Sequence, residues 1–150
     1  AQPESLTVML VRCLYASRAA AGTSAAILDD ILVQSRRNNP ANGITGMLCV
    51  SNNVFIQVLE GGRDEVCDLY HAIVRDTRHE QLRLLAYEEI TERRFGGWTM
   101  GQVNLAKVNP GQLLKYFKRA ELDPFDAPGS ATLSLLSELV ASASLIGRGD

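Results

Sequence analysis

Residues 43–62 read GITGMLCVSNNVFIQVLEGG, and this stretch predicts a β-hairpin. Two runs of mainly apolar residues, 44–51 and 53–60, are joined at Asn52-Asn53. Asparagine tolerates the left-handed backbone conformations that a tight turn between two strands requires. Gly61-Gly62 ends the second run. The chain is therefore expected to turn back on itself here, and the flanking elements must fit around an antiparallel strand pair.

A strand and a helix are predicted before the hairpin. Residues 6–16 form an apolar run typical of a strand. Ser24 can cap a helix that runs to about Asn38, because its apolar residues fall in one stripe with a period of 3.6. Pro40 stops this helix, since the residue before a proline avoids the helical region.

A helix and two strands are predicted after the hairpin. Residues 63–76 carry apolar side chains at helical spacing, residues 81–90 form a fourth strand, and residues 97–105 form a weaker fifth. The order β-α-β-β-α-β-β predicts an α+β fold of the ferredoxin-like βαββαβ type with an extra fifth strand. Its two helices would cover one face of a mixed sheet and leave the other face bare.

The C-terminal part of the chain offers a cover for that bare face. Asn109-Pro110 has the composition of a helix start, which predicts a helix near 110–120, and an apolar stripe predicts a second helix over 131–146. We expect one domain over residues 1–105 and a helical extension over residues 106–150. The two C-terminal helices would pack on the bare face of the sheet, on another subunit or on a partner protein.

Composition excludes several classes of protein. The chain has 150 residues, of which 46% are hydrophobic and 21% charged, as in an ordinary soluble domain. The net charge of −2 carries no basic excess, so neither nucleic acid nor an anionic membrane is a favoured partner. No apolar run approaches the roughly 20 residues that span a bilayer, and the start of the chain lacks the basic region of a signal peptide.

The cysteines and histidines do not suggest a metal or disulfide scaffold. Cys13, Cys49 and Cys67 are odd in number and far apart, which fits a reducing cytosol and hence a cytoplasmic location. His71 and His79 have no carboxylate or thiolate companions at metal-ligand spacing, so the sequence predicts no metal site. The motifs of serine hydrolases, P-loop proteins and dinucleotide-binding folds are also missing from the sequence.

Gln57 interrupts the apolar run of the second hairpin strand. A buried amide that is left without a hydrogen-bond partner costs about 1–3 kcal/mol, so Gln57 is expected to have one. The partner is either a neighbouring protein group or a ligand.

Other polar and aromatic residues fall where the predicted fold would bring them towards Gln57. They are Tyr15 on the first strand, and Asn38-Asn39 and Arg78-His79 at the ends of the two helices. Trp98 and Met100 are predicted to share one face of the fifth strand, as residues of the core. Each has an ordinary structural explanation, such as a boundary tyrosine, a helix stop or core packing. Together they suit a groove for an aromatic heterocycle, because asparagine offers both a donor and an acceptor to an amide-like edge. Ile31 and Ile73 would supply apolar walls.

Several sequence motifs, in this order and spacing, resemble the BLUF domain, a blue-light sensor that uses flavin. The matching strings are YAS at 15–17, DIL at 30–32, RNNPANGITGMLCVS at 37–51, FIQVLEGG at 55–62, IVRDTRH at 73–79 and RRFGGWTM at 93–100. The resemblance covers roughly residues 6–105. The remaining tail is similar in kind to that of short, stand-alone BLUF proteins, which have two C-terminal helices and no enzymatic output domain.

The resemblance implies a flavin, usually FAD, held without a covalent bond between the two helices; FMN and riboflavin are alternatives. Asn38 and Asn39 would hydrogen-bond the pyrimidine side of the ring system. The other implied neighbours of the flavin are Asp76, Arg78 and His79 along the same edge or the ribityl side, Ile31 and Ile73 on the two ring faces, and Ser17, Trp98 and Met100 around them.

The resemblance further implies that Tyr15 and Gln57 form a photoactive pair. Blue light would drive electron and proton transfer from Tyr15 through Gln57 and leave the amide rotated or tautomerised, in a red-shifted signalling state. Trp98 and Met100 lie on the strand that leads to the tail and would relay the change.

A photosensory protein of this kind is expected to signal rather than to catalyse a reaction. The implied effector is a separate protein, either response-regulator-like or a cyclic-di-nucleotide enzyme, and the apolar stripes of the tail suit a homo-oligomer. Two alternatives are a light-insensitive binding module and a small enzyme such as an acylphosphatase. The enzyme would need an early arginine in an anion-binding loop, for which Arg18 alone is weak support.

Overall fold

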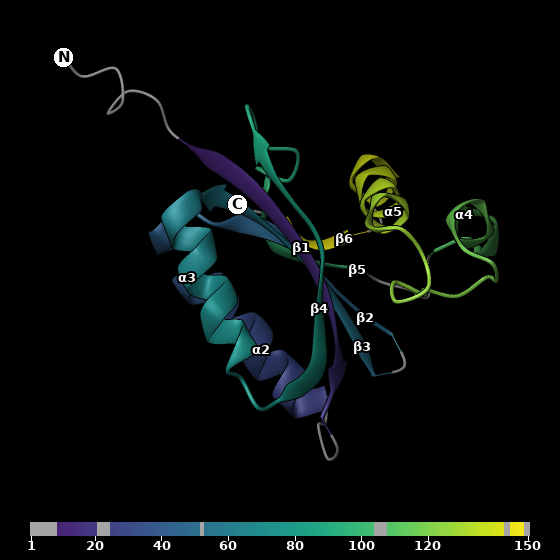
Figure 1. Cartoon of the computed structure of the whole chain (residues 1–150), viewed down its shortest axis with the longest axis horizontal. Helices are drawn as coiled ribbons and strands as arrows, with labels where there is room; N and C mark the ends of the chain where they lie inside the picture. The colour runs from purple at the N-terminus through teal and green to yellow at the C-terminus, as the bar shows by residue number, and fades with distance from the viewer. Residues whose placement is uncertain (1–8, 21–24, 52, 104–107, 143–144, 149–150) are drawn as a thin grey trace.

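A single mixed sheet, with helices on both faces, organises the computed structural model of the chain (Figure 1). The structure describes residues 9–20, 25–51, 53–103, 108–142 and 145–148. The six strands, in the spatial order β4-β1-β3-β2-β5-β6, are β1 (Leu10–Ala19), β2 (Thr45–Ser51), β3 (Val54–Gly62), β4 (His79–Ile90), β5 (Trp98–Val103) and β6 (Leu145–Arg148). The helices are α2 (Ala25–Asn38), a short 3-10 helix η1 (Pro40–Asn42), α3 (Arg63–Val74), α4 (Pro110–Tyr116) and α5 (Gly129–Ser142).

The predicted hairpin is confirmed and forms the middle of the sheet. β2 and β3 pair in antiparallel register from Thr45 opposite Glu60 to Ser51 opposite Val54. Asn53 has a φ of 69°, which is the left-handed turn conformation expected there. β3 also pairs with β1 along its other edge, so it is enclosed by neighbours on both sides and is buried from residue 54 to residue 61. The strand that carries Gln57 is therefore the most enclosed strand of the sheet.

Each face of the sheet has its own apolar core. The face towards α2 and α3 buries Val11, Cys13, Tyr15, Phe55, Leu59 and Met100 among others. The opposite face buries Leu14, Met47, Ile56 and Val58 against Leu135, Leu136 and Leu139 of α5. This division follows from the alternation of side chains along β1 and β3. It confirms the ferredoxin-like arrangement and the prediction that the tail covers the face that α2 and α3 leave bare (Figure 1).

Two local features define where the C-terminal helices begin. The side chain of Asn109 accepts a hydrogen bond from the Gly111 N–H at 2.8 Å, and the Asn109 N–H donates to the side chain of Gln112, so the predicted N-cap of α4 is a full capping box. A Cβ atom at position 129 would lie 2.4 Å from the Leu85 carbonyl oxygen. Only glycine lets α5 begin this close to β4.

Several predicted boundaries differ from the structure. β1 continues to Ala19, α3 ends at Val74 rather than at residue 76, β4 begins at His79 rather than at residue 81, and α4 ends at Tyr116 rather than near residue 120. The predicted start of the first strand at residue 6, the cap Ser24, the turn residue Asn52 and the domain boundary at 105–106 lie outside the described residues.

The prediction of one helix over 131–146 was wrong at its C-terminal end. α5 stops at Ser142, and residues 145–148 form β6, antiparallel to β5. An edge strand has unpaired N–H and C=O groups that a short segment can satisfy. Pairing with the open edge of β5 therefore replaces the last turn of the predicted helix, and the sheet has six strands instead of five.

The prediction that Trp98 and Met100 share one face of the sheet was also wrong. Met100 has a φ of 55°, and the register between β5 and β6 shifts between Trp98 and Gln102. A left-handed residue interrupts the alternation of side chains along a strand. Met100 consequently packs on the α2–α3 side, whereas Trp98 packs in the core beneath α5.

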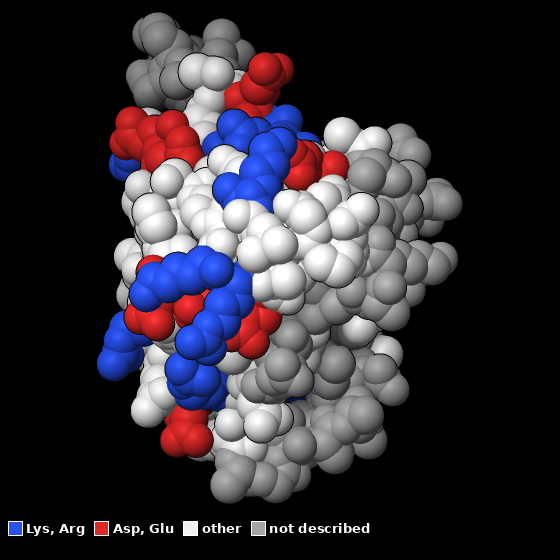
Figure 2. All heavy atoms as spheres, turned by 90° about the vertical axis from the view of Figure 1, so that its right-hand side faces the viewer, with Lys and Arg blue, Asp and Glu red and all other residues white. Residues whose placement is uncertain are grey.

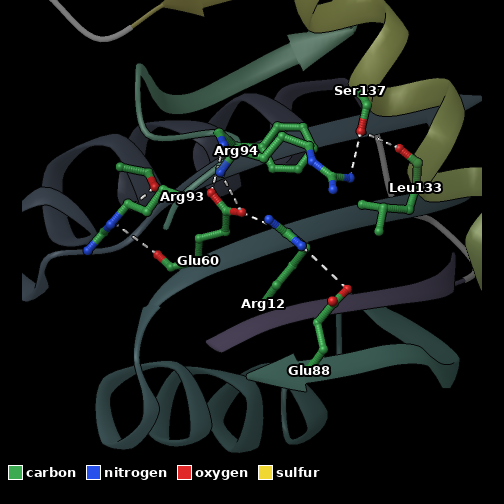
Figure 3. Close-up of polar contacts among 9 residues, drawn as sticks. Arg12, Glu60, Glu88, Arg93, Arg94, Leu133 and Ser137 are labelled. Carbon is green, nitrogen blue, oxygen red and sulfur yellow. Dashed lines mark hydrogen bonds and ion pairs between the residues drawn. The ribbon is translucent and has the colours of Figure 1, made fainter. Parts of the chain in front are cut away.

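A buried ion pair fastens the connection between β4 and β5 to the centre of the sheet (Figure 3). The carboxylate of Glu60 is fully buried on the α5 side of β3 and lies 2.7 Å from Nε of Arg12, which is itself 5% exposed. The same carboxylate accepts the N–H groups of Arg94 and Phe95 at 3.0 and 2.7 Å. Three donors therefore hold the Glu60 carboxylate, which places Phe95 in the core.

This attachment extends to α5. The Arg94 guanidinium donates to Ser137 Oγ at 3.0 Å, and the Ser137 hydroxyl donates to the Leu133 carbonyl of the same helix (Figure 3). On the other side, Arg93 donates to Thr45 Oγ1 at 3.0 Å and to the Glu60 carbonyl at 3.3 Å. The strand that carries Gln57 is thus connected to α5 through polar contacts as well as through the apolar core.

We expect the free energy of unfolding to fall as the pH rises above about 9. Burial raises the pKa of the Cys13 thiol and the pKa of the Cys49 thiol, each to about 12. Cys67 makes a smaller contribution to the raised pKa of Cys13. Because both pKa values are raised in the folded state, the stability is fully present below the unfolded pKa and is lost between about pH 9 and 12. The loss is about 1.4 kcal/mol per pH unit for each thiol.

Chemical denaturation at a series of pH values checks this expectation. Between pH 9 and 10, the free energy of unfolding should fall less steeply with pH in Cys49→Ala than in the wild type, by about 1.4 kcal/mol per pH unit. This difference in slope is expected whatever the effect of the variant on stability at pH 7. An unchanged slope in this variant would contradict the raised pKa of Cys49.

Candidate functional site

A cavity of about 690 Å³ lies between α2 and α3 above the sheet. Its volume is within the range of small-molecule and cofactor sites. The sequence-predicted site residues that line it are Tyr15, Ile31, Asn38, Asn39, Gln57, Ile73, Asp76, Arg78 and His79. Two further predicted residues, Ser17 and Met100, lie directly behind this wall in contact with His79 and Gln57. Trp98 is the exception, because it packs on the opposite face of the sheet.

Tyr15 and Gln57 meet at the floor of the cavity. They are direct partners in the pairing of β1 with β3, so their side chains stand next to each other on the same face. The Tyr15 hydroxyl donates a hydrogen bond to Gln57 Oε1, and Gln57 Nε2 donates to the sulfur of Met100 at 3.1 Å. A thioether is a weak acceptor, so one end of the amide is held much more firmly than the other.

The surroundings of Tyr15 keep its phenol protonated. Tyr15 is 3% exposed, and burial is the main reason that its pKa lies far above the usual value; Cys13, Asp76 and Tyr70 raise it further. The Tyr70 and His79 rings approach its ring edge-on, with centroids at 6.1 and 6.3 Å. At neutral pH Tyr15 is therefore a neutral hydrogen-bond donor with an oxidisable ring.

Asn39 presents an unused donor to the cavity. The residue is 3% exposed, and its buried Nδ2 has no hydrogen-bond partner in the structure. Its backbone is fixed, because its carbonyl accepts the N–H groups of Asn42 and Ile44 at 3.0 and 2.8 Å. A buried donor without a partner costs about 1–3 kcal/mol, which a bound acceptor would recover.

Asp76 and Arg78 form the polar end of the cavity. Arg78 Nη2 lies 2.5 Å from Asp76 Oδ2, and it also donates to Gln34 of α2 at 3.2 Å. The hydrogen bond from Arg78 lowers the pKa of Asp76, and the same bond raises the pKa of Arg78. Both groups are charged at neutral pH and orient each other at the mouth of the groove.

Ser17 and His79 connect the end of β1 to the end of α3. His79 Nε2 lies 2.9 Å from the Ile73 carbonyl, which can only accept, so Nε2 carries the proton. In the neutral ring Nδ1 then accepts from the Ser17 hydroxyl at 2.7 Å. The His79 ring also meets Phe55 edge-on at 6.0 Å, so these contacts fix one wall beside Tyr15.

The cavity includes further residues that the sequence analysis did not single out. They are Gln34, Ser35, Arg37, Ala41, Asn42, Ile44, Leu48, Phe55, Glu65, Asp68, Leu69 and Ala72. Helical spacing from Ile31 to Asn38 and from Leu69 to Asp76 could have identified those on α2 and α3, because residues three and four apart share a helix face. The same spacing includes Glu65 and Asp68, which lie four residues before Leu69 and Ala72 on α3.

The sequence model of the BLUF family, described as sensors of blue-light using FAD, matches residues 10–101. The chain belongs to the BLUF family. Photoactivated adenylate cyclase subunit beta of Euglena gracilis is 34% identical over 92 residues, which are 61% of this chain and 11% of that protein. The chain thus spans about a tenth of the length of this relative, in which the BLUF region accompanies a cyclase.

Solved BLUF proteins have the same fold. BlsA in its photo-activated state is 31% identical, with a TM-score of 0.77 over 88% of this chain and 95% of that chain. BlrB, a BLUF protein in its dark state, is 29% identical, with a TM-score of 0.72 over 91% of this chain and 98% of that chain. The similarity to these solved chains extends well beyond residues 10–101, so it includes part of the C-terminal extension.

The described residues contain no group of three histidine, cysteine, aspartate or glutamate side chains that could hold a metal ion. None of the helices in the described part of the chain has both the length and the hydropathy needed to cross a bilayer.

Proposed function

We propose that this BLUF chain senses blue light through the hydrogen-bonded pair Tyr15–Gln57 and passes the change on to a protein effector. The observation that carries the proposal is the chain of contacts from the Tyr15 hydroxyl through the Gln57 amide to the Met100 sulfur at the cavity floor. An amide with one strong and one weak hydrogen bond can change its bonding without a large cost in energy.

The cavity fits the flavin that the family uses. The unpartnered Nδ2 of Asn39 would donate to a carbonyl of the flavin ring edge, with Asn38 beside it. Ile31 and Ile73 would contact the two ring faces, and Asp76, Arg78 and His79 would line the polar end of the groove. The cofactor is FAD in this proposal, and FMN or riboflavin would use the same ring contacts. Bound flavin would supply blue-light absorption and an excited state that accepts an electron.

Tyr15 and Gln57 would carry out the response. Loss of an electron makes a phenol strongly acidic, so the Tyr15 proton would move along its existing hydrogen bond to Gln57 Oε1. When the electron returns, Tyr15 takes a proton back from the protonated Gln57 amide and regains its neutral ring. Return of the Oε1 proton leaves the ordinary amide, which is then rotated, and loss of an Nε2 proton leaves the tautomer. The bond to Met100 is then lost or replaced, and the signalling state is a shift between two arrangements of the same groups.

The C-terminal extension would carry the signal outward and need no catalytic activity of its own. Figure 2 shows the side of the molecule that carries α4 and α5. Basic (blue) and acidic (red) residues are mixed within clusters there, and uncharged surface (white) lies between the clusters. Lys115 pairs with Glu138 between the two helices at 2.5 Å, and the Leu114 side chain is 56% exposed. This surface suits a protein contact, either in a homo-oligomer or with an effector such as a response-regulator-like protein or a cyclic-di-nucleotide enzyme, in the cytoplasm.

Absorption spectroscopy of the flavin-loaded protein in the dark and under blue light tests the proposed function. We expect a flavin spectrum whose long-wavelength band moves reversibly to the red under light. A protein that binds flavin but shows no such shift would be a light-insensitive binding module.

We expect Asn39→Leu to weaken flavin binding by about tenfold, because the variant removes one buried hydrogen bond to the ring edge. Equilibrium titration of the variant with FAD and with riboflavin checks this. Val33→Leu on the exposed side of α2 is the control and should bind both flavins like the wild type. Equal affinity in wild type and Asn39→Leu would exclude Asn39 from the site.

A further inference from the structure

Arg36 of α2 contacts β5 at the one irregular point of that strand. Its Nε donates to the carbonyl oxygen of Met100 at 3.3 Å. Its Nη2 is buried without a hydrogen-bond partner, so placing the guanidinium here costs desolvation free energy. Arg36 does not line the cavity, unlike its neighbours Ser35 and Arg37, so flavin binding does not account for its placement.

The backbone of Met100 needs such a restraint. Among the described residues other than glycine, positive φ values occur at Asn53, Gln81 and Met100, and only Met100 is buried. A left-handed conformation is unfavourable for a bulky residue and persists only where its surroundings hold it. The cost is similar in size to the gain from one hydrogen bond donated by a charged group.

The φ angle of Met100 decides which residue of β5 faces Gln57. In the observed conformation the Met100 side chain is fully buried beside Gln57, and Trp98 is buried in the core beneath α5. If residue 100 were extended, strand alternation would place Trp98 and Met100 on the same face. Because Gly101 and Gln102 are held in register with β2, a change in the φ angle of residue 100 would move the preceding part of β5 and remove Trp98 from the α5 core.

We propose that Arg36 is a positioning residue that holds Met100 in its left-handed conformation, and so keeps Met100 against Gln57 and Trp98 beneath α5. The role of Met100 at Gln57 rests on the proposed light response, whereas the placement of Trp98 by Arg36 exists in the dark and does not depend on it.

The fluorescence of Trp98 tests this directly, because it is the only tryptophan in the sequence. The purified protein is kept in the dark, and the accessibility of Trp98 is measured by acrylamide quenching of its fluorescence lifetime. We expect Arg36→Met to increase the population with accessible Trp98 by about tenfold or more, which is the effect of losing one charge-assisted hydrogen bond. Arg36→Lys keeps a charged donor and should restore most of the protection.

Two further variants separate positioning from general destabilisation. Arg83→Gln removes an exposed arginine that donates to the Leu82 carbonyl, and it should leave Trp98 protected. Met100→Gly accepts a positive φ without strain, so adding Arg36→Met to Met100→Gly should change Trp98 accessibility little. If Arg36→Met does not fold, Arg36→Leu, which has no donor for the Met100 carbonyl, replaces it in the same comparisons.

The proposal is overturned if Trp98 stays protected in a folded Arg36→Met or Arg36→Leu protein, or if removing Arg36 has the same effect with methionine and with glycine at position 100. A wild-type protein without a light-induced shift would disprove the proposed function instead, and it would leave the dark-state result on Trp98 unaffected.

Discussion

Glu60→Ala is expected to lower the free energy of unfolding by about 3–5 kcal/mol, a large part of the 5–15 kcal/mol that stabilises a typical domain. The substitution removes the carboxylate that lies 2.7 Å from the Arg12 guanidinium, which is 5% exposed, and leaves Arg12 only its longer contact with the half-exposed Glu88 at 3.4 Å. It also leaves the N–H groups of Arg94 and Phe95 without an acceptor in the core (Figure 3). Removing the buried member of this ion pair is costly because the Arg12 charge stays buried and loses its close partner.

Urea unfolding followed by circular dichroism measures this loss. Glu89→Ala is the matched control, since Glu89 pairs with Arg63 at 2.5 Å but its side chain is 62% exposed. Exposed pairs contribute about 0–1 kcal/mol, so this control should unfold almost like the wild type. If Glu60→Ala and Glu89→Ala lost the same small amount, the Glu60 attachment would not stabilise the fold.

Tyr15→Phe is expected to abolish the light-induced absorption shift while the protein still folds and binds flavin. The variant keeps the aromatic ring but removes the hydroxyl that donates to Gln57 Oε1, and with it both the transferable proton and the firm end of the amide. The lost hydrogen bond should lower the free energy of unfolding by only about 1–3 kcal/mol. Dark and illuminated absorption spectra of the flavin-loaded variant check the result, and Gln57→Leu should behave in the same way.

Tyr70→Phe provides the control for Tyr15→Phe. Tyr70 approaches Tyr15 edge-on at 6.1 Å on the same side of the sheet, but it does not line the cavity and has no contact with Gln57 among the described hydrogen bonds. The light response should survive in this control. If Tyr15→Phe kept a normal absorption shift, or if only Tyr70→Phe lost it, Tyr15 would not be the photoactive tyrosine.

Periodicity and turn chemistry were sufficient to predict the framework of the fold. The hairpin of β2 and β3, the two helices on one face and the C-terminal helices on the other all follow from local patterns that the tertiary structure keeps. Tyr15 and Gln57 were placed on neighbouring strands, and they are direct partners in the sheet. The unusual amide in an apolar strand was thus a reliable indication of a polar site.

Features that depend on tertiary contacts could not be read from the sequence. Nothing in the string GWTM indicates that Met100 takes a φ of 55°, because the restraint comes from Arg36, 64 residues earlier in the chain. The burial of Glu60 was hidden for the same reason, since its partners lie in β1 and in the β4–β5 connection. β6 was missed because it forms by pairing with an open strand edge.

The proposed light response depends on a change in the bonding of one side chain, and NMR of the Gln57 amide in ¹⁵N-glutamine-labelled, flavin-loaded protein tests that change most directly. Gln57→Leu assigns the signal by its disappearance, and spectra are recorded in the dark, under blue light and after return to the dark. We predict that the Gln57 side-chain signal moves under light and returns in the dark, while that of the partly buried Gln112 in α4 stays in place. A Gln57 signal that is unchanged during a clear red shift of the flavin would contradict the proposed role of Gln57.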